Sequence, residues 1–323
     1  MPHIRLHRRP AALALALVLS LVALGAREAN ARSRVRTYER RGRWSYVFQA
    51  GANTHLQYFA GIAQLALLRN YAREHWGLVQ FAFFSNRGKR ALSLLQFAGW
   101  NAMREGYFLV QAGGLNQFRQ LISAVQIGGL NEARFFAGAL QAGVVNDVGD
   151  IGAIAQVAAV NLIDDDAYMG LQVGGLNFVQ GSSSELWTLA QVGLANVFDK
   201  GAELYALLQL GLYNSGDDDI SVILAQIGVV NRMTEGTFRG LLQIGAAMNV
   251  GENITGVAVA PYNYVGDRLY GAQIGVVNLA REVNGTQIGL FNYARTLHGV
   301  QLGLINISRH GGLPFCVIGN IGF

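Results

Sequence analysis

Residues 111–146 read QAGGLNQFRQLISAVQIGGLNEARFFAGALQAGVVN, a stretch in which the pattern Gln-x-Gly-x-x-Asn occurs three times. Successive glutamines are about 15 residues apart, and a fixed short period is typical of a chain built from one small unit used repeatedly. We interpret these residues as a structural repeat. Its clearest copies are Gln111, Gly113 and Asn116; Gln126, Gly128 and Asn131; Gln226, Gly228 and Asn231; Gln273, Gly275 and Asn278; Gln287, Gly289 and Asn292; and Gln301, Gly303 and Asn306.

The repeat extends beyond its clearest copies in both directions. Upstream, the same phase is followed by Gln96/Ala98/Asn101, Gln80/Ala82/Ser85, Gln64/Ala66 and Gln49/Gly51. Three copies between the clear ones depart from the pattern, because Ala158 replaces the glycine after Gln156, Asn249 comes one residue late and Ala258 replaces a glutamine. Phe315/Val317/Asn320 reads as the last copy, so the repeat predicts one continuous domain.

Each unit is predicted to be a β-strand followed by a turn. The residues on either side of each glutamine are apolar, as in Val125 and Ile127, and a glycine stands at a fixed place inside the segment. Glycine in this position disfavours a helix, and the pattern has no helical period. Acidic and glycine-rich turns such as Asp164–Asp166 separate the units. The fold class is therefore all-β.

One architecture that fits these units is an up-and-down transmembrane β-barrel of about 16–18 strands. About 11 extended residues per unit match a membrane strand, and aromatic residues such as Trp76 and Tyr264 lie near the unit ends. The sequence ends on Phe323, and Ile321, Val317 and Phe315 precede it at alternate positions. That ending resembles the C-terminal strand signal of bacterial outer-membrane barrel proteins, which implies a membrane-assembly role for these four residues. The sequence favours this barrel.

The alternative is a β-solenoid of stacked coils, each of about 15 residues. Gln and Asn are five residues apart, so in one continuous strand they would point to opposite faces, and the Asn would face lipid. In stacked coils, identical Gln and Asn residues would instead form hydrogen-bonded ladders. Against the solenoid, the sequence shows no polar capping units at its ends.

The N-terminus predicts export. Residues 1–31 have a basic start, an apolar run from Ala11 to Leu24 and the small-x-small sequence Ala29-Asn30-Ala31, as in a secretory signal peptide. An arginine-rich lead-in follows at 32–43, and 44–323 forms the single β-repeat domain. The single cysteine, Cys316, excludes an intrachain disulfide.

The sequence predicts no enzyme, cofactor or metal site. The histidines occupy unrelated places in the repeat, and the acidic runs Asp164–Asp166 and Asp217–Asp219 lack a calcium-loop layout, so they read as solvated turns. No nucleotide-binding or nucleophile motif occurs. Charged residues make up only 14% of the chain, and no basic surface for nucleic acid is expected from the repeat.

The units Gly271-Ala-Gln-Ile-Gly-Val-Val-Asn278 and Gly299-Val-Gln-Leu-Gly-Leu-Ile-Asn306 resemble a family of bacterial surface-repeat proteins with Gly-x-Gln-x-Gly-x-x-Asn copies. This resemblance covers roughly 106–308 and implies a Gram-negative outer-membrane or cell-surface location without known chemistry. The expected partners are outer-membrane lipid and the barrel-assembly machinery. The predicted function is a non-enzymatic structural or pore-like protein; the alternative is a secreted or surface-attached solenoid that binds a partner through one face.

Overall fold

A computed structural model of the chain describes residues 42–181, 184–199, 201–217 and 220–323. The predicted signal peptide at 1–31 and nearly all of the basic lead-in at 32–43 lie outside this range. The strands are β1 Gly42–Ala82, β2 Ser85–Ile163, β3 Ala167–Val179, β4 Glu185–Phe198, β5 Glu203–Asp217, β6 Ile220–Val259, β7 Tyr262–Ile274, β8 Val277–Ile288, β9 Phe291–His310 and β10 Cys316–Gly322. In the part of the chain that the structure describes, no helix is long and apolar enough to cross a membrane.

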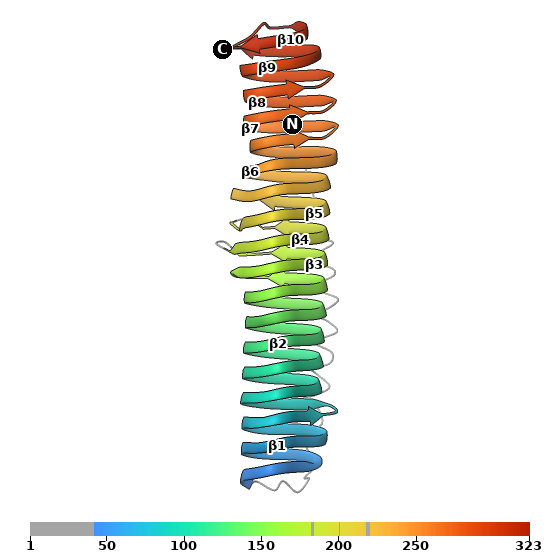
Figure 1. The fold of residues 1–323 in the computed structure, drawn as a ribbon, viewed down its shortest axis with the longest axis vertical. Helices are drawn as coiled ribbons and strands as arrows, with labels where there is room; N and C mark the ends of the chain where they lie inside the picture. Colours follow the sequence, from blue (N-terminus) through green and yellow to red (C-terminus); the bar gives the residue numbers. More distant parts are fainter. Residues whose placement is uncertain (1–41, 182–183, 200, 218–219) are drawn as a thin grey trace, which may run out of the picture. The chain divides into compact units, whose positions relative to one another are not determined.

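The strands follow one another in sequence order in a single sheet, and neighbours are parallel from β1 to β9. Longer strands such as β2 wind through several coils (Figure 1). Equivalent repeat residues pair directly, for example Gln172 with Gln191 and Asn177 with Asn196. The described chain is therefore a β-solenoid, and the favoured prediction of an antiparallel barrel is wrong.

Each coil has three straight sides joined by two-residue corners. Side chains that point inward come in pairs two residues apart, and two outward residues separate one pair from the next. In the coil that begins at Gln111 the inward pairs are Gln111/Gly113, Asn116/Phe118 and Leu121/Ser123. We call these the Gln side, the Asn side and the third side. The corner after the glycine turns the chain, so Gln and Asn both point inward despite their odd spacing.

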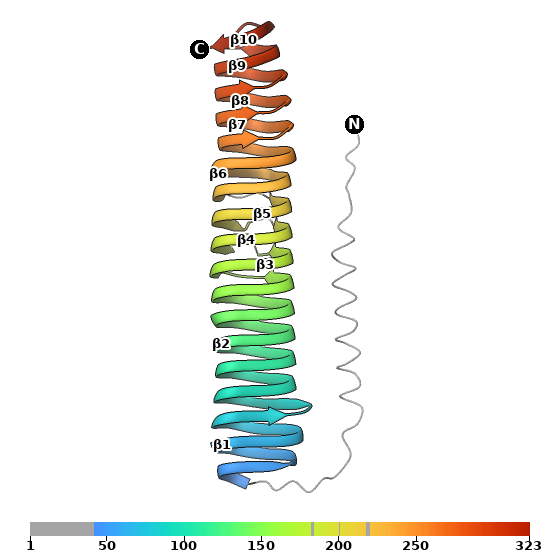
Figure 2. The same ribbon diagram turned by 45° about the vertical axis from the view of Figure 1, so that its right-hand side comes forward.

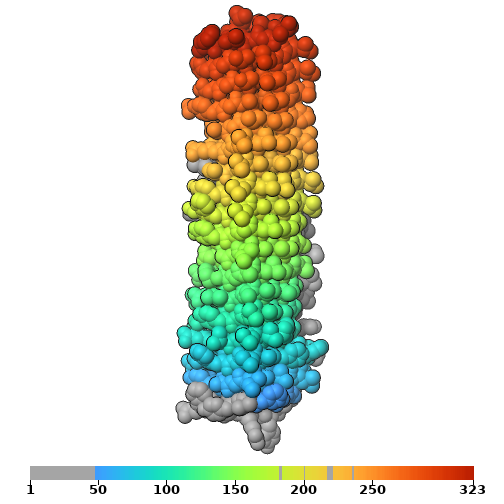
Figure 3. All heavy atoms as spheres, viewed as in Figure 1, coloured from blue at the N-terminus to red at the C-terminus, as the bar shows by residue number. Residues whose placement is uncertain are grey.

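The interior combines buried amides on two sides with an apolar core on the Asn and third sides. Among the largest fully buried side chains are Leu121, Phe136, Ile151 and Leu186, which belong to one continuous cluster. Successive coils follow in sequence order as bands in the space-filling view (Figure 3). Each coil alone is too thin to bury its inward residues, so neighbouring coils provide the cover.

The C-terminal coils are tighter than the central ones. In the central coils the next glutamine comes five positions after the buried third-side residue, as Gln141 does after Phe136, whereas Gln287 comes four positions after Val283. Gly285 lies in this shortened corner with φ of 146°. Only glycine adopts that conformation without strain, so the deletion of one residue is absorbed there. The same corner contains Gly256, Gly271 and Gly299, all with positive φ.

The C-terminal end of the stack is capped by β10, which is antiparallel to β9 and pairs Asn320 with Gln301 (Figure 2). Phe315/Val317/Asn320 is therefore no further coil, and β10 closes this end of the stack with exposed side chains that are apolar rather than polar. A paired terminal strand covers an edge that would otherwise be free to recruit another chain. The four residues of the predicted membrane-assembly signal are exposed here: Phe315, Val317, Ile321 and Phe323. Their assembly role stays a prediction.

Candidate functional site

An asparagine ladder runs along the inside of the stack. From Asn70 to Asn292, each Asn Nδ2 donates to the Oδ1 of the Asn in the next coil, over 2.7–3.0 Å. The same nitrogens also donate to a backbone carbonyl in the next coil, as Asn131 does to Ala142 O over 2.8 Å. These buried amides are thus hydrogen-bonded, which offsets the free energy that desolvation costs.

The glycine of the repeat makes room for this ladder. A Cβ added at Gly128 would come within 2.4 Å of Asn116 Nδ2 and 2.5 Å of Asn131 Oδ1. Similar contacts with ladder amides recur at Gly113, Gly228, Gly289 and other equivalent glycines. The Gln-x-Gly-x-x-Asn pattern is therefore a single packing unit in which glycine leaves the volume that two asparagine amides occupy.

A glutamine ladder runs beside it with the opposite direction of donation. Each Gln Nε2 donates to the Oε1 of the preceding coil over 2.6–3.1 Å, in three segments: Gln49 to Gln96, Gln126 to Gln243 and Gln273 to Gln301. The first break lies at Gln111, which donates to Asn116 of its own coil. The second lies at Ala258, where Gln243 Oε1 has no hydrogen-bond partner.

The outer surface of the Gln side is an uncharged face. We define it by three rows: the residue after each Gln, from Leu65 to Leu302; the residue two places further on, from Leu67 to Leu304; and the residue two places before each Gln, from Ile62 to Gly299, with Ala258 counted as a Gln. Every residue in these rows is aliphatic, Phe, Pro or Gly. No Asp, Glu, Lys, Arg or His occurs between or beside them on this side or its two corners.

The uncharged face is exposed to a degree that is unusual for large apolar side chains. Leu67 is 69% exposed, Ile154 70% and Leu194 62%. Coils spaced by the usual strand distance give the face a length of roughly 75 Å and an area on the order of 1,000 Å². Contiguous apolar patches on soluble monomers seldom exceed a few hundred Å². The face is therefore the strongest candidate for a binding site.

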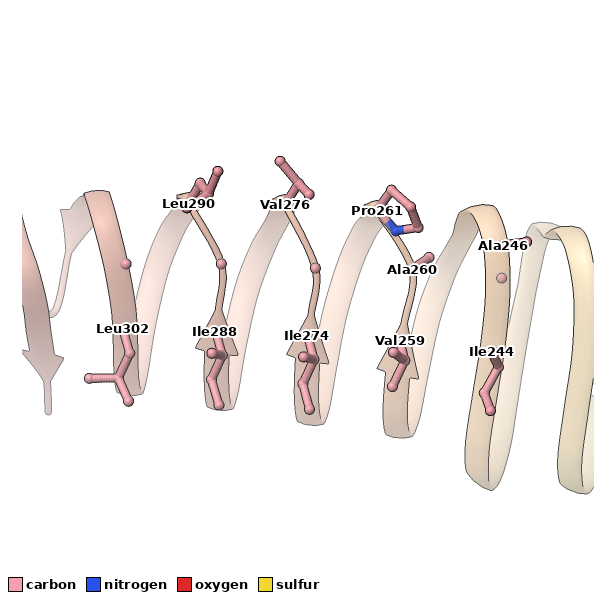
Figure 4. A pocket seen from close by; sticks show the side chains of 14 residues that line it. Ile244, Ala246, Val259, Ala260, Pro261, Ile274, Val276, Ile288, Leu290 and Leu302 are labelled. Atoms are coloured by element: carbon pink, nitrogen blue, oxygen red, sulfur yellow. The ribbon is translucent and has the colours of Figure 1, made fainter.

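The face contains a groove over its C-terminal coils. Two rows of side chains form its walls, with Ile274 and Ile288 in one and Val276 and Leu290 in the other (Figure 4). Gly275 and Gly289, which come between these residues in the chain, also line the groove. A side chain at Gly275 or Gly289 would point into the interior, so only backbone lies between the two walls. The groove has a volume of about 640 Å³ and extends from Ile244 to Gly303.

Aromatic residues border the face on both flanks. On the third side they form a broken row of outward residues: Trp76, Tyr107, Tyr168, Trp187, Tyr205 and Tyr270. The residue after the ladder asparagine is aromatic at Tyr71, Phe178, Tyr264 and Tyr293. Trp187 and Tyr205 stack with ring centroids 4.2 Å apart, and each donates to a glutamate two residues earlier in the chain. The hydrogen bond to Glu203 raises the pKa of Tyr205.

The corner between the Asn side and the third side is charged. We call it the charged corner and define it by Arg104/Glu105, Arg119/Gln120, Arg281/Glu282 and the equivalent pairs of the other coils. Ion pairs join adjacent coils here, as Arg90 Nε to Glu105 Oε2 over 2.8 Å and Arg268 Nε to Glu282 Oε2 over 3.5 Å. In the three-sided coil this corner lies opposite the Gln side, so charge and apolar surface are segregated.

Acidic residues gather beside the charged corner around a second groove of about 600 Å³. Burial raises the pKa of Asp147 to about 6, and the nearby Asp164 and Glu132 carboxylates add to that shift. Asp164 and Asp165 form the bend between β2 and β3, and Asp166 Oδ1 accepts from Glu185 N over 3.1 Å. Among the described residues no cluster of His, Cys, Asp and Glu has a metal-binding arrangement. Asp218 and Asp219 lie outside the described residues.

His75 is the one described histidine that is fully buried. Its ring stacks on Phe59 with centroids 4.7 Å apart, and its Nδ1 lies 3.1 Å from Gln64 Oε1. Burial lowers the pKa of His75 to about 4, so the ring is neutral at physiological pH. It occupies a core position rather than a cleft.

The predicted repeat residues come together as the two ladders, but they are buried and face no solvent. In the upstream coils the sequence pattern placed Ser85 in the Asn position, whereas the ladder uses Asn70 and Asn86, one residue later. The exposed rows of the uncharged face were not predicted from the sequence as a candidate site. The sequence does contain a pattern that indicates them, because the stretch from two residues before to four residues after each Gln contains no charged residue in any coil from Gln64 to Gln301.

A comparison with known proteins found no family model, no curated protein and no solved structure that matches the chain.

Proposed function

We propose that the chain is an exported, non-enzymatic β-solenoid that binds an apolar partner through its uncharged face. The observation that carries this proposal is the unbroken set of apolar rows from Ile62 to Leu304. Leaving such a surface in water opposes solubility, so its uniform presence in every coil favours a binding role. Its solenoid architecture and the resemblance to surface-repeat units support attachment at a cell surface.

The interior supports a structural rather than a catalytic role. The buried polar groups of the coils are chiefly Gln and Asn amides, which are neither acids nor bases at physiological pH. Most of them are committed to the ladders. The ionisable side chains lie mainly at the charged corner, where they pair across coils. The stack therefore resembles a rigid scaffold that presents a surface.

Detergent binding tests the proposal. The exported chain is purified in a nonionic detergent, and bound detergent is measured by size-exclusion chromatography with light scattering. We expect a bound detergent layer that decreases strongly in the variant Leu194→Lys/Leu212→Lys, because both side chains lie on the uncharged face. The matched control Gln57→Lys/Gln120→Lys adds the same charge on exposed residues away from the face and should bind detergent like the unmodified chain. Equal binding in all three proteins contradicts the proposal.

A further inference from the structure

We infer that the partner of the uncharged face is the surface of a lipid bilayer, with the stack axis parallel to the membrane plane. This inference rests on the proposed function and specifies its partner. It differs from a transmembrane arrangement, because only one side of the three-sided coil enters the lipid. The charged corner, on the opposite side, remains in water.

The composition of the face favours lipid over a protein partner. Protein interfaces are about 56–65% apolar and contain about one hydrogen bond per 100–200 Å². The three rows of the uncharged face contain no polar side chain at all over their whole length. Specific protein association also uses charge to fix register, and this face has none. A surface with no hydrogen-bonding side chain is suited to hydrocarbon.

The backbone of the face meets the requirement that lipid imposes. Polar backbone groups in hydrocarbon must be paired within the protein. In the groove, Gly275 N donates to Ile288 O and Gly289 N donates to Leu302 O, both over 2.9 Å, and Val276 N donates to Pro261 O over 3.0 Å. These bonds run between coils, along the stack, so they do not point out of the face. Lipid contact would therefore break none of them.

The aromatic flanks lie where the membrane–water interface would be. Trp and Tyr rings favour that interface because they have an apolar body and a polar edge. Trp187 Nε1 donates to Glu185 Oε2 over 3.0 Å and Tyr205 Oη donates to Glu203 Oε2 over 2.6 Å. Both rings thus combine an exposed apolar surface with a polar edge bound to a carboxylate. This aromatic flank lies on the third side, whereas on the Asn side the residue after the ladder asparagine is aromatic in four coils (Tyr71, Phe178, Tyr264 and Tyr293) and charged in four others (Arg87, Glu132, Asp147 and Arg232).

The length of the uncharged face determines how the stack can lie on a membrane. A face of roughly 75 Å is more than twice the roughly 30 Å thickness of the hydrocarbon core, so it can be covered only if the axis lies in the membrane plane. An interfacial element typically buries its apolar face by about 5–10 Å. The groove between the rows of Ile274 and Val276 runs along the same axis and is walled by aliphatic side chains, a shape that accepts an acyl chain.

Vesicle flotation tests this inference. The exported chain is mixed with phosphatidylcholine vesicles and centrifuged on a density gradient, beside Leu194→Lys/Leu212→Lys and the control Gln57→Lys/Gln120→Lys. We expect the chain and the control to float, and the face variant to lose on the order of 10-fold or more of its partitioning, because lysines would enter the lipid. All three proteins have the same N-terminus, so residues before the solenoid cannot explain the difference. Circular dichroism checks that the face variant is folded.

Depth is measured by tryptophan quenching with brominated lipids. We expect bromine near the headgroups to quench more than bromine near the chain ends, and Trp187→Phe to reduce the quenched signal. If the chain stays at the bottom of the gradient but forms oligomers that the face lysines dissociate, the partner is a second copy, and the lipid inference is overturned while the proposed function stands. If it neither floats, nor associates, nor binds detergent, both are overturned.

Discussion

The uncharged face and the charged corner are formed by the same coils and share one interior, yet their surfaces have opposite chemistry. At the corner, charges of both signs pair between coils, as Arg90 does with Glu105. On the face, one apolar residue follows another from Leu65 to Leu302. Because the ladders beneath are the same in nearly every coil, the difference does not arise from folding requirements. The difference in surface chemistry belongs to the outward residues alone, and it indicates that the outward residues of the face have a function.

Disrupting the shared interior should have the largest effect. In Gly128→Ala the new methyl group would collide with Asn116 and Asn131 and separate two ladder amides. We expect the free energy of unfolding to fall by about 3 kcal/mol or more, measured by urea denaturation. Gly152→Ala is the matched control, since nothing lies within 4 Å of its added Cβ. It should be neutral or slightly stabilising, and an equal loss in both variants would contradict the role assigned to the glycine.

Titrating the interior should have the next largest effect. His75 has a pKa of about 4 in the folded chain against 6.5 as the ordinary value, so the unfolded chain binds the proton first. The contribution of neutral His75 to the free energy of unfolding should therefore be fully present above pH 6.5. The free energy of unfolding should fall by roughly 3 kcal/mol as the pH drops to about 4. His75→Leu should remove this part of the pH dependence. Identical pH profiles of stability in the two proteins would refute the prediction.

Titrating Asp147, which lies beside the charged corner, should have a smaller effect of the opposite sign. The pKa of Asp147 is raised to about 6, so the folded chain holds this proton more tightly than the unfolded chain does. The contribution of this proton to the free energy of unfolding is fully present below pH 3.8 and is lost as the pH rises through about 6. We expect Asp147→Asn to stabilise the chain at pH 7 by no more than about 1 kcal/mol, since the group is partly exposed. In thermal melts, Asp147→Asn should raise the melting temperature at pH 7 and leave it unchanged at pH 3.5. An equal rise at both pH values would contradict the prediction.

Charging the uncharged face should have the smallest effect on stability. Leu224 is about half exposed and contributes little to the core. We expect Leu224→Lys to change the free energy of unfolding by no more than about 0.5 kcal/mol. A large loss in urea denaturation would mean that the face is required for folding, and the separation between interior and surface functions would not hold.

The sequence predicted the repeat, the all-β class and the participation of Gln, Gly and Asn in one unit. It did not decide between antiparallel and parallel pairing, because a unit of about 11 extended residues fits both a membrane strand and most of a coil. The observation that should have decided it was the five-residue spacing of Gln111 and Asn116, which requires a corner if both amides are buried. The aromatic residues near the unit ends favoured a membrane strand, whereas in the structure Trp187 and Tyr205 stack along one flank of the solenoid.

The candidate site was harder to predict for a physical reason. Apolar residues such as Val192 and Leu210 alternate with Gln, and a sequence alone does not tell which set faces inward. Apolar-inside is the usual assumption, but here the polar set is buried because each amide finds its equivalent in the next coil. The break at Gln111 depends on the conformation of a single side chain, which the repeat pattern does not specify, whereas the break at Ala258 follows from the missing glutamine in the sequence.

The parallel register is the central claim, because the uncharged face exists only if equivalent residues lie side by side. Disulfide formation tests it most directly, in a Cys316→Ser background that removes the native thiol. The register of β7 and β8 pairs Tyr270 with Asn284, and that of β8 and β9 pairs Leu279 with Tyr293, each at a distance that a disulfide can span. In an antiparallel hairpin the numbers of two paired residues have a constant sum, so no single hairpin register could form both pairs. We predict that Tyr270→Cys/Asn284→Cys and Leu279→Cys/Tyr293→Cys each form an intrachain disulfide on mild oxidation. A disulfide in only one of the two variants, or in neither, would contradict the stacked coil and the face built on it.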